Sequence, residues 1–248
     1  MQIKKTMGTY KRVLLKLSGE SLAGTSKLGI ESASLESYAK EIQSVVEKGI
    51  QTAIVLGGGN IFRGIQGSKT GIDRVQGDYM GMLATIINSM ALQSALANLG
   101  IPATVLSGIP IDTLCAKMNR RAAIQLLEEG QVVIIAGGTG NPFFTTDSSA
   151  ALRAAEIKAD AILKGTRVDG VYSADPEKDP GAVKYDRLSF EEAYDKNLKV
   201  MDLTAFTICR ENNIPVIVFD VNEPGILYDL LVNGKPHGTI VSNRRDRA

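Results

Sequence analysis

Residues 132–147 read VVIIAGGTGNPFFTTD, a run of apolar residues followed by a glycine-rich turn. A continuous apolar run bounded by turn residues is typical of a strand buried on both faces, as in a parallel sheet. Glycine has no Cβ, so the backbone N–H groups of such a turn can approach an anion closely. The stretch therefore predicts a buried strand that ends in a ligand-binding turn.

Two more glycine turns follow apolar runs in the same way. Leu17-Ser18-Gly19 follows the run 13–15, and the triple glycine 57–59 follows the run 53–56. The carboxyl ends of parallel strands form the ligand crevice of an open α/β sheet. One glycine turn is weak evidence, but three at strand ends indicate a crevice that holds several phosphates.

Strand-like and helix-like patterns alternate through most of the chain. This alternation predicts βαβ units and a doubly wound α/β sheet within one domain, residues 1–248. Strands are expected at 12–17, 52–56, 102–106, 132–136, 161–164, 214–219 and 238–242. Helices are expected at about 35–49, 73–99, 119–129, 148–158, 202–212 and 224–232, with a short one opening at Ser189.

Local signals refine three of these segments. Asp147 is a candidate N-cap for the helix at 148–158, and Ser189 with Glu192 has the spacing of a capping box. The helix at 73–99 is rich in methionine and small residues, which is typical of either a core helix or a subunit contact. The loop-rich stretch 166–188 indicates a β-hairpin or a cover over the active site.

Composition excludes several classes of function. The 28 Lys+Arg nearly balance the 27 Asp+Glu, so bulk affinity for nucleic acid or a membrane surface is not indicated. No apolar run approaches the ~20 residues that span a bilayer, and the first residues lack the apolar region of a signal peptide. Cys115 and Cys209 lie far apart, which disfavours a zinc site or a disulfide framework and predicts a reduced, cytoplasmic protein. The single histidine, His237, disfavours a histidine-centred triad.

Common nucleotide motifs fail, which leaves basic residues beside the glycine turns. Gly19-x4-Gly24 is not followed by Lys-Ser/Thr, so the chain has no P-loop, and the glycines at 57–59 do not continue as GxGxxG. Lys16, Arg63 and Lys164 lie at or just after strand ends. Phosphoryl transfer needs mainly positive charge around well-positioned phosphate oxygens. These three cations therefore favour phosphate chemistry, with a carboxylate such as Asp147 able to orient the lysines.

Five motifs and their order carry a family resemblance. They are KLSGE (16–20), GGGNIFRG (57–64), GDYMGMLAT (77–85), GTGNPFFTTD (138–147) and VDGVYSADP (168–176). Together they resemble the bacterial uridylate (UMP) kinases of the amino acid kinase family, and the resemblance extends from about residue 10 to 242. It implies a three-layer αβα sandwich with a mainly parallel central sheet. It also implies the reaction ATP + UMP to ADP + UDP, an early step towards pyrimidine nucleotides.

The resemblance also implies site residues. The catalytic set is Lys16, Asp147 and Lys164. The residues implied to contact ATP are Lys16, Leu17, Ser18, Gly19, Gly59, Arg63, Thr166, Tyr172 and Asp175. Those implied to contact UMP are Gly58, Asp78, Thr139, Gly140, Asn141, Pro142, Phe143, Phe144, Thr145 and Thr146. The acceptor half would cover about 10–155 and the ATP-nucleoside half about 156–248.

Cofactor and partner expectations follow from the same resemblance. Mg²⁺ is expected to arrive with ATP, held mainly by phosphates and water and not by a dedicated protein metal site. The family implies a homo-oligomer, a hexamer built from dimers, with GTP and UTP as candidate effectors. Two alternatives stay open. One is an amino acid kinase relative whose acceptor is a small acid, and the other is a non-catalytic nucleotide sensor or oxyanion-storage protein on the same fold.

Overall fold

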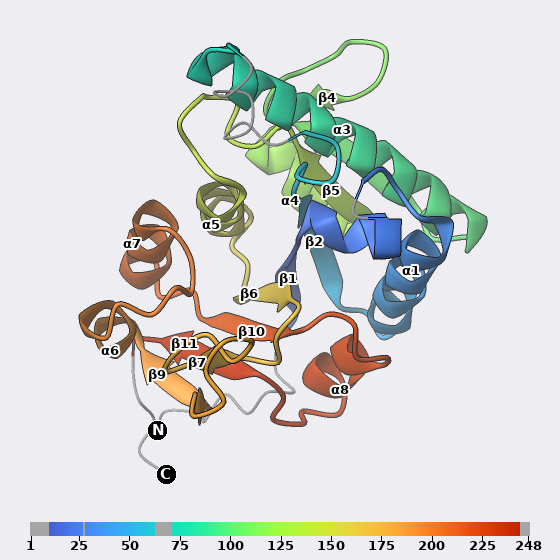
Figure 1. Cartoon of the computed structure of the whole chain (residues 1–248). Coiled ribbons are helices and arrows are strands. Elements are labelled where there is room, and N and C mark those ends of the chain that lie inside the picture. The colour runs from blue at the N-terminus through green and yellow to red at the C-terminus, as the bar shows by residue number, and fades with distance from the viewer. Residues whose placement is uncertain (1–9, 27, 63–70, 244–248) are drawn as a thin grey trace.

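A computed structural model describes residues 10–26, 28–62 and 71–243. A nine-stranded sheet runs through the molecule (Figure 1). In spatial order its strands are β4 (Ala116–Lys117), β3 (Ala103–Ser107), β5 (Val132–Ala136), β2 (Gln51–Leu56), β1 (Arg12–Leu17), β6 (Ala161–Thr166), β10 (Val216–Asp220), β11 (Thr239–Ser242) and β9 (Arg187–Ser189). Strands β7 (Val171–Tyr172) and β8 (Lys184–Tyr185) form a separate antiparallel hairpin.

The sheet is mainly parallel, as the sequence predicts. Every strand pair from β4 to β10 is parallel, whereas β11 runs antiparallel to β10 and β9 runs parallel to β11. The register between β1 and β6 pairs Lys16 directly with Lys164. Direct partners on adjacent parallel strands project to the same face. The two lysines expected at the reaction centre therefore leave the sheet side by side.

Helices cover both faces of the sheet. They are α1 (Ser32–Val46), α3 (Arg74–Asn98), α4 (Arg120–Glu128), α5 (Thr146–Ile157), α6 (Phe190–Asp195), α7 (Leu203–Glu211) and α8 (Ile226–Leu231), and a 3-10 helix, η2, covers Gly19–Ser26. Residues of α1, α3 and α8 share one apolar core, and those of α4 to α7 share the other. Strand β1 contributes Val13, Leu15 and Leu17 to the first core and Leu14 to the second. This alternation makes the fold the expected three-layer αβα sandwich.

Helix α3 qualifies the expectation about membranes. It is the one helix in the described part of the chain that is long and apolar enough to cross a bilayer, judged by length and composition alone. Half of its most apolar window, 50%, is buried inside the fold. A core helix of a soluble protein meets the same criterion, so this feature is weak evidence for a membrane span.

The start of α5 differs from the expectation. Thr145, not Asp147, is the N-cap, and its Oγ1 accepts hydrogen bonds from the backbone N–H groups of Asp147 and Ser148. The helix consequently begins at Thr146, and the Asp147 carboxylate is left to point away from the helix end. The capping box of Ser189 and Glu192 is confirmed, as is the small hairpin within 166–188. The short strands β4 and β9 and the helix η2 were not expected.

Candidate active site

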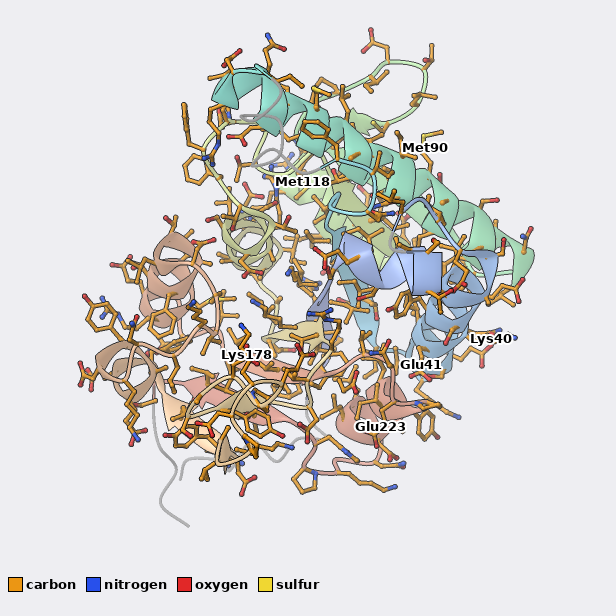
Figure 2. The ribbon with its side chains drawn as sticks, in the orientation of Figure 1. Lys40, Glu41, Met90, Met118, Lys178 and Glu223 are labelled. Carbon is orange, nitrogen blue, oxygen red and sulfur yellow. The ribbon has the colours of Figure 1, made fainter. Side chains whose placement is uncertain are left out.

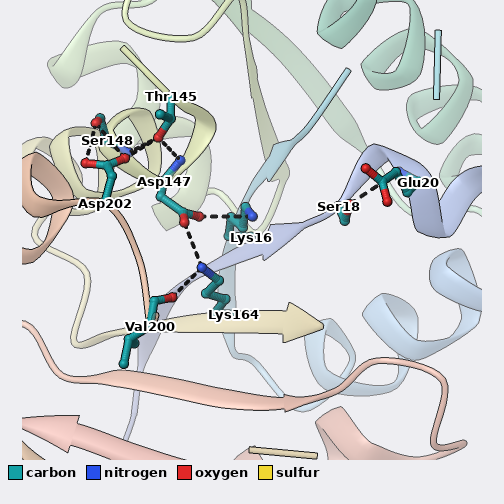
Figure 3. Close-up of polar contacts among 9 residues, drawn as sticks. All are labelled: Lys16, Ser18, Glu20, Thr145, Asp147, Ser148, Lys164, Val200 and Asp202. Atoms are coloured by element: carbon teal, nitrogen blue, oxygen red, sulfur yellow. Dashed lines mark hydrogen bonds and ion pairs between the residues drawn. The ribbon is translucent and has the colours of Figure 1, made fainter. Parts of the chain in front are cut away.

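Lys16, Asp147 and Lys164 form one ion-paired cluster at the carboxyl ends of the central strands (Figure 3). Lys16 Nζ lies 3.0 Å from Asp147 Oδ1, and Lys164 Nζ lies 2.7 Å from Asp147 Oδ2. Lys164 also donates a 2.5 Å hydrogen bond to the carbonyl of Val200. One carboxylate thus bridges two ammonium groups that leave adjacent strands.

The charged side chains of this cluster are largely buried. The three side chains are only 14%, 17% and 12% exposed, for Lys16, Asp147 and Lys164 respectively. Burial opposes the charge of Asp147, but the two ammonium groups outweigh it and hold the pKa of this carboxyl below its usual value. Burial, reinforced by Lys16, lowers the pKa of Lys164 in spite of Asp147. When both lysines are protonated the cluster carries one surplus positive charge, which an anion can neutralise.

Asp202 fixes the first turn of α5, from which Asp147 projects. Ser148 Oγ donates to both carboxylate oxygens of Asp202 at 2.9 Å, and the Thr145 hydroxyl donates to the same carboxylate. Asp202 also caps α7 by accepting from the backbone N–H of Ala205 at 2.9 Å. One carboxylate therefore ties the starts of two helices together, and this restricts where Asp147 can lie.

The first two glycine turns touch each other. The backbone N–H of Gly57 donates to the carbonyl of Leu17 at 3.0 Å. A Cβ on Gly19 would lie 2.4 Å from the carbonyl oxygen of Gly57, so no larger residue fits there without a shift of backbone. The close approach of these two turns is the structural reason for glycine at position 19.

A buried pair of asparagines holds the second turn against α3. Asn88 Nδ2 donates to the Gly57 carbonyl at 2.7 Å and to Asn60 Oδ1 at 2.7 Å, and Asn60 Nδ2 donates back to Asn88 Oδ1 at 3.0 Å. Both residues are fully buried. Buried amides of this kind are stable only when their partners are fixed, so the pair locks the turn in place.

The third turn is held by Thr85, the last residue of the GDYMGMLAT motif, and by Arg153, which the sequence did not single out. The backbone N–H of Gly137 donates to Thr85 Oγ1 at 2.8 Å, and Arg153 Nη2 donates to the carbonyl of Gly138 at 3.0 Å. Arg153 is buried on α5 and pairs with Glu156 at 2.8 Å. Neither contact has a local sequence pattern, because each joins residues that are distant in the chain.

A cavity of about 410 Å³ lies beside the second and third turns. Of the residues implied to contact UMP, those lining it are Gly58, Asp78, Thr139, Asn141, Phe144, Thr145 and Thr146. Gly140, Pro142 and Phe143 do not line it, whereas Gly59, implied to contact ATP, does. Asp78 accepts hydrogen bonds from the backbone N–H of Phe143 at 2.7 Å and from Arg74 Nε at 2.9 Å. Arg63 lies outside the described residues.

A second cavity, of about 460 Å³, lies between the β7–β8 hairpin and residues 196–200. Of the residues implied to contact ATP, Thr166, Tyr172 and Asp175 line it, whereas residues 16–19 do not; Lys164 of the implied catalytic set lines it as well. Both cavities fall within the roughly 300–1,000 Å³ typical of small-molecule sites. Lys164 lines this cavity, and Asp147 directly follows Thr145 and Thr146 of the other. The ion-paired cluster thus adjoins this cavity through Lys164 and is joined to the other through the residues that directly precede Asp147.

Comparisons with known proteins agree on one family. The model of the amino acid kinase family matches residues 11–220. The chain is 55% identical over 237 residues to the uridylate kinase of Parabacteroides distasonis, covering 96% of this chain and all of that protein. It is equally similar, at 55% over 237 residues, to the uridylate kinase of Porphyromonas gingivalis, covering 96% of this chain and 99% of that one. The UMP kinase of Bacillus anthracis superposes with a TM-score of 0.92 at 40% identity, covering 95% of this chain and 97% of the other.

Proposed function

Because the chain belongs to the amino acid kinase family, we propose that it transfers the γ-phosphoryl group of ATP to UMP, giving ADP and UDP on the route to pyrimidine nucleotides. The observation that carries this proposal is the ion-paired cluster of Lys16, Asp147 and Lys164, whose Lys164 lines one nucleotide-sized cavity and whose Asp147 directly follows two residues of a second. The full-length similarity to uridylate kinases supports UMP as the acceptor.

The chemistry needs charge and alignment more than proton transfer. The attacking atom is a phosphate oxygen of UMP, which is already ionised at neutral pH, so no general base is required. Lys16 and Lys164 stabilise the negative charge on the transferring phosphoryl group, and Asp147 offsets the repulsion between the two ammonium groups and holds them in place. The turn at residues 17–19 contributes backbone N–H groups to the ATP phosphates.

Each cavity has its own ligand in this proposal. The ATP nucleoside occupies the cavity beside the hairpin, near Thr166, Tyr172 and Asp175. UMP occupies the cavity at residues 138–146, where backbone groups read the uracil. Asp78 accepts hydrogen bonds from the ribose hydroxyls, in exchange for its present contacts with Arg74 and the Phe143 N–H. Residues 10–155 and 156–248 then act as acceptor and ATP-nucleoside halves of one domain.

Magnesium is proposed to reach this site as a partner of ATP. The described residues contain no group of three or more histidine, cysteine, aspartate or glutamate side chains that could hold a metal ion. Mg²⁺ prefers to keep several waters and to bind substrate phosphates. An ion bound to the ATP phosphates would neutralise part of their charge, while the two lysines neutralise the rest.

A coupled assay of ADP release with UMP, CMP, dUMP and AMP tests the function. We expect turnover with UMP and much slower turnover with CMP, because the proposal assigns the recognition of uracil to backbone groups at residues 139–146. Equal rates with UMP and CMP would contradict this reading role. Turnover with carbamate, acetylglutamate or aspartate would favour the small-acid alternative, and ATP binding without any turnover would favour the nucleotide sensor.

We also propose a homo-oligomer, assembled through α3. Met80, Leu83, Ile87 and Met90 recur at helical spacing, and all are more than a third exposed; Figure 2 marks Met90 on this helix. An exposed apolar stripe of this kind is typical of a protein interface. The family's hexamer built from dimers accounts for it, and GTP and UTP are the effectors to test in the same assay.

Replacing Ile87 with glutamate is expected to dissociate the oligomer. Ile87 is 51% exposed in the single chain, and a charge buried at its interface would be unpaired. Light scattering coupled to size exclusion should show a smaller particle for Ile87→Glu than for the matched surface variant Thr207→Glu on α7. An unchanged particle mass would locate the interface elsewhere.

A cytoplasmic location belongs to the same proposal. Cys115 and Cys209 are both buried and unpaired, which suits a reducing compartment. Burial raises the pKa of Cys209 to about 12, so its thiol is not a nucleophile at neutral pH.

A further inference from the structure

We infer that Thr239, in β11, is a positioning residue that sets the β7–β8 hairpin over the ATP cavity. The inference rests on the proposed function, because it assigns ATP to the cavity that this hairpin borders. Thr239 lines neither cavity and is fully buried. Its effect on ATP must therefore pass through the hairpin.

One hydroxyl holds both strands of the hairpin. The backbone N–H of Val171, in β7, donates to Thr239 Oγ1 at 2.7 Å, and the same hydroxyl donates to the carbonyl of Tyr185, in β8. Val171 and Tyr185 are themselves direct partners across the hairpin. The hydroxyl thus accepts a hydrogen bond from one residue of a directly paired couple and donates one to the other, so it bridges the two strands where they pair.

The hairpin needs such an anchor because it is short. Each of its strands has two residues, and an isolated two-stranded hairpin is at best marginally stable in water. Thr239 itself is fixed by the central sheet, where it pairs with Val218 of β10. It therefore connects a rigid element to a weak one, which is what a positioning residue must do.

The hairpin carries a large share of the ATP cavity. Residues 170–176 line it continuously, and they include Tyr172 and Asp175. Asp169 accepts hydrogen bonds from the Tyr172 hydroxyl at 2.5 Å and from Lys184 Nζ at 2.7 Å, so the two strands also share side-chain contacts. A change in how the hairpin sits on the sheet would move all these groups relative to the nucleoside.

Glycine at position 170 fits the same account. A Cβ there would lie 2.6 Å from Thr239 Oγ1 and 2.8 Å from Lys184 Cε. The hairpin packs so closely on the hydroxyl that the residue before Val171 can carry no side chain. Gly170→Ala should consequently lift the hairpin from the sheet without changing Thr239.

The test compares Thr239→Val with Thr239→Ser. Valine keeps the shape but leaves the Val171 N–H and the Tyr185 carbonyl without this partner, whereas serine keeps the hydroxyl. We expect Thr239→Val to raise KM for ATP about tenfold, as expected when buried polar groups lose a partner. KM for UMP should stay at the value of the unaltered chain, and Thr239→Ser should restore KM for ATP. Gly170→Ala should reproduce the valine phenotype.

Several outcomes would overturn the inference. The inference is wrong if Thr239→Val leaves KM for ATP unchanged or raises KM for ATP and UMP together. It is also wrong if the serine variant is as defective as the valine variant. Thermal unfolding of all three variants checks that they fold. If Thr239→Val does not fold, Gly170→Ala still tests whether the position of the hairpin sets KM for ATP. Calorimetry with ATP alone separates the two ideas, because it measures the hairpin's effect even on a chain that does not phosphorylate UMP.

Discussion

Lys164→Ala is expected to lower kcat for UDP formation by roughly 10²- to 10³-fold, the usual loss when one group that stabilises transition-state charge is removed. Lys164 lines the cavity proposed to hold the ATP nucleoside and belongs to the ion-paired cluster, with its ammonium 2.7 Å from Asp147. At a site this buried, the charge–charge interaction is stronger than in water, so solvent does not replace the lost ammonium group without cost. Initial rates at saturating ATP and UMP measure the effect.

The fold should survive this change. Burial already disfavours the charged form of Lys164, so alanine removes a group whose charge is costly to bury. Asp147 keeps its ion pair with Lys16 at 3.0 Å, so the carboxylate is not left alone. Circular dichroism and thermal unfolding should therefore resemble those of the unaltered chain.

The matched control is Lys40→Ala, which removes a lysine from the exposed face of α1 (Figure 2). It should leave kcat unchanged. A Lys164→Ala protein that is folded and turns over at the rate of this control would refute the proposed role of the cluster.

Much of this site could be predicted because its residues follow strand ends. Lys16 and Lys164 come from apolar runs whose parallel arrangement the sequence indicates, and the register pairs them directly. The family motifs supplied the residues implied to contact UMP, seven of which line one cavity. Strand ends converge whatever the details of packing, so such predictions need little knowledge of long-range contacts.

The rest depended on partners that no local pattern reveals. Asp147 resembles an N-cap in the sequence, yet Thr145, two residues earlier, is the N-cap. The Thr145 hydroxyl is held by Asp202, the N-cap residue of α7, which lies far away in the sequence. Arg153 and Thr239 lie in ordinary helix and strand patterns, and only their contacts with Gly138 and Val171 connect them with the site. Such contacts are set by the tertiary fold.

Asp147→Asn is expected to lower kcat by about 10²-fold, because the two lysines lose the group that orients them. It should also move the alkaline limb of the kcat profile to lower pH. In the unaltered chain burial lowers the pKa of Lys164, and the charge of Asp147 partly offsets this. Neutral asparagine cannot offset it, so Lys164 should lose its proton at lower pH than before.

The sign of the stability change at low pH separates this effect from a general loss of structure. The pKa of Asp147 is lower in the folded chain than its ordinary value of 3.8, so its contribution to stability is present above that value and is lost as pH falls through the folded pKa. Asp147→Asn should therefore lose stability relative to the unaltered chain at neutral pH, and the difference should shrink in acid. Asp229→Asn, at a surface ion pair with Lys235, should leave the alkaline limb of kcat in place. If the alkaline limb also stays in place in Asp147→Asn, the charge of Asp147 does not affect the pKa of Lys164. The proposed electrostatic role of the cluster would then be wrong.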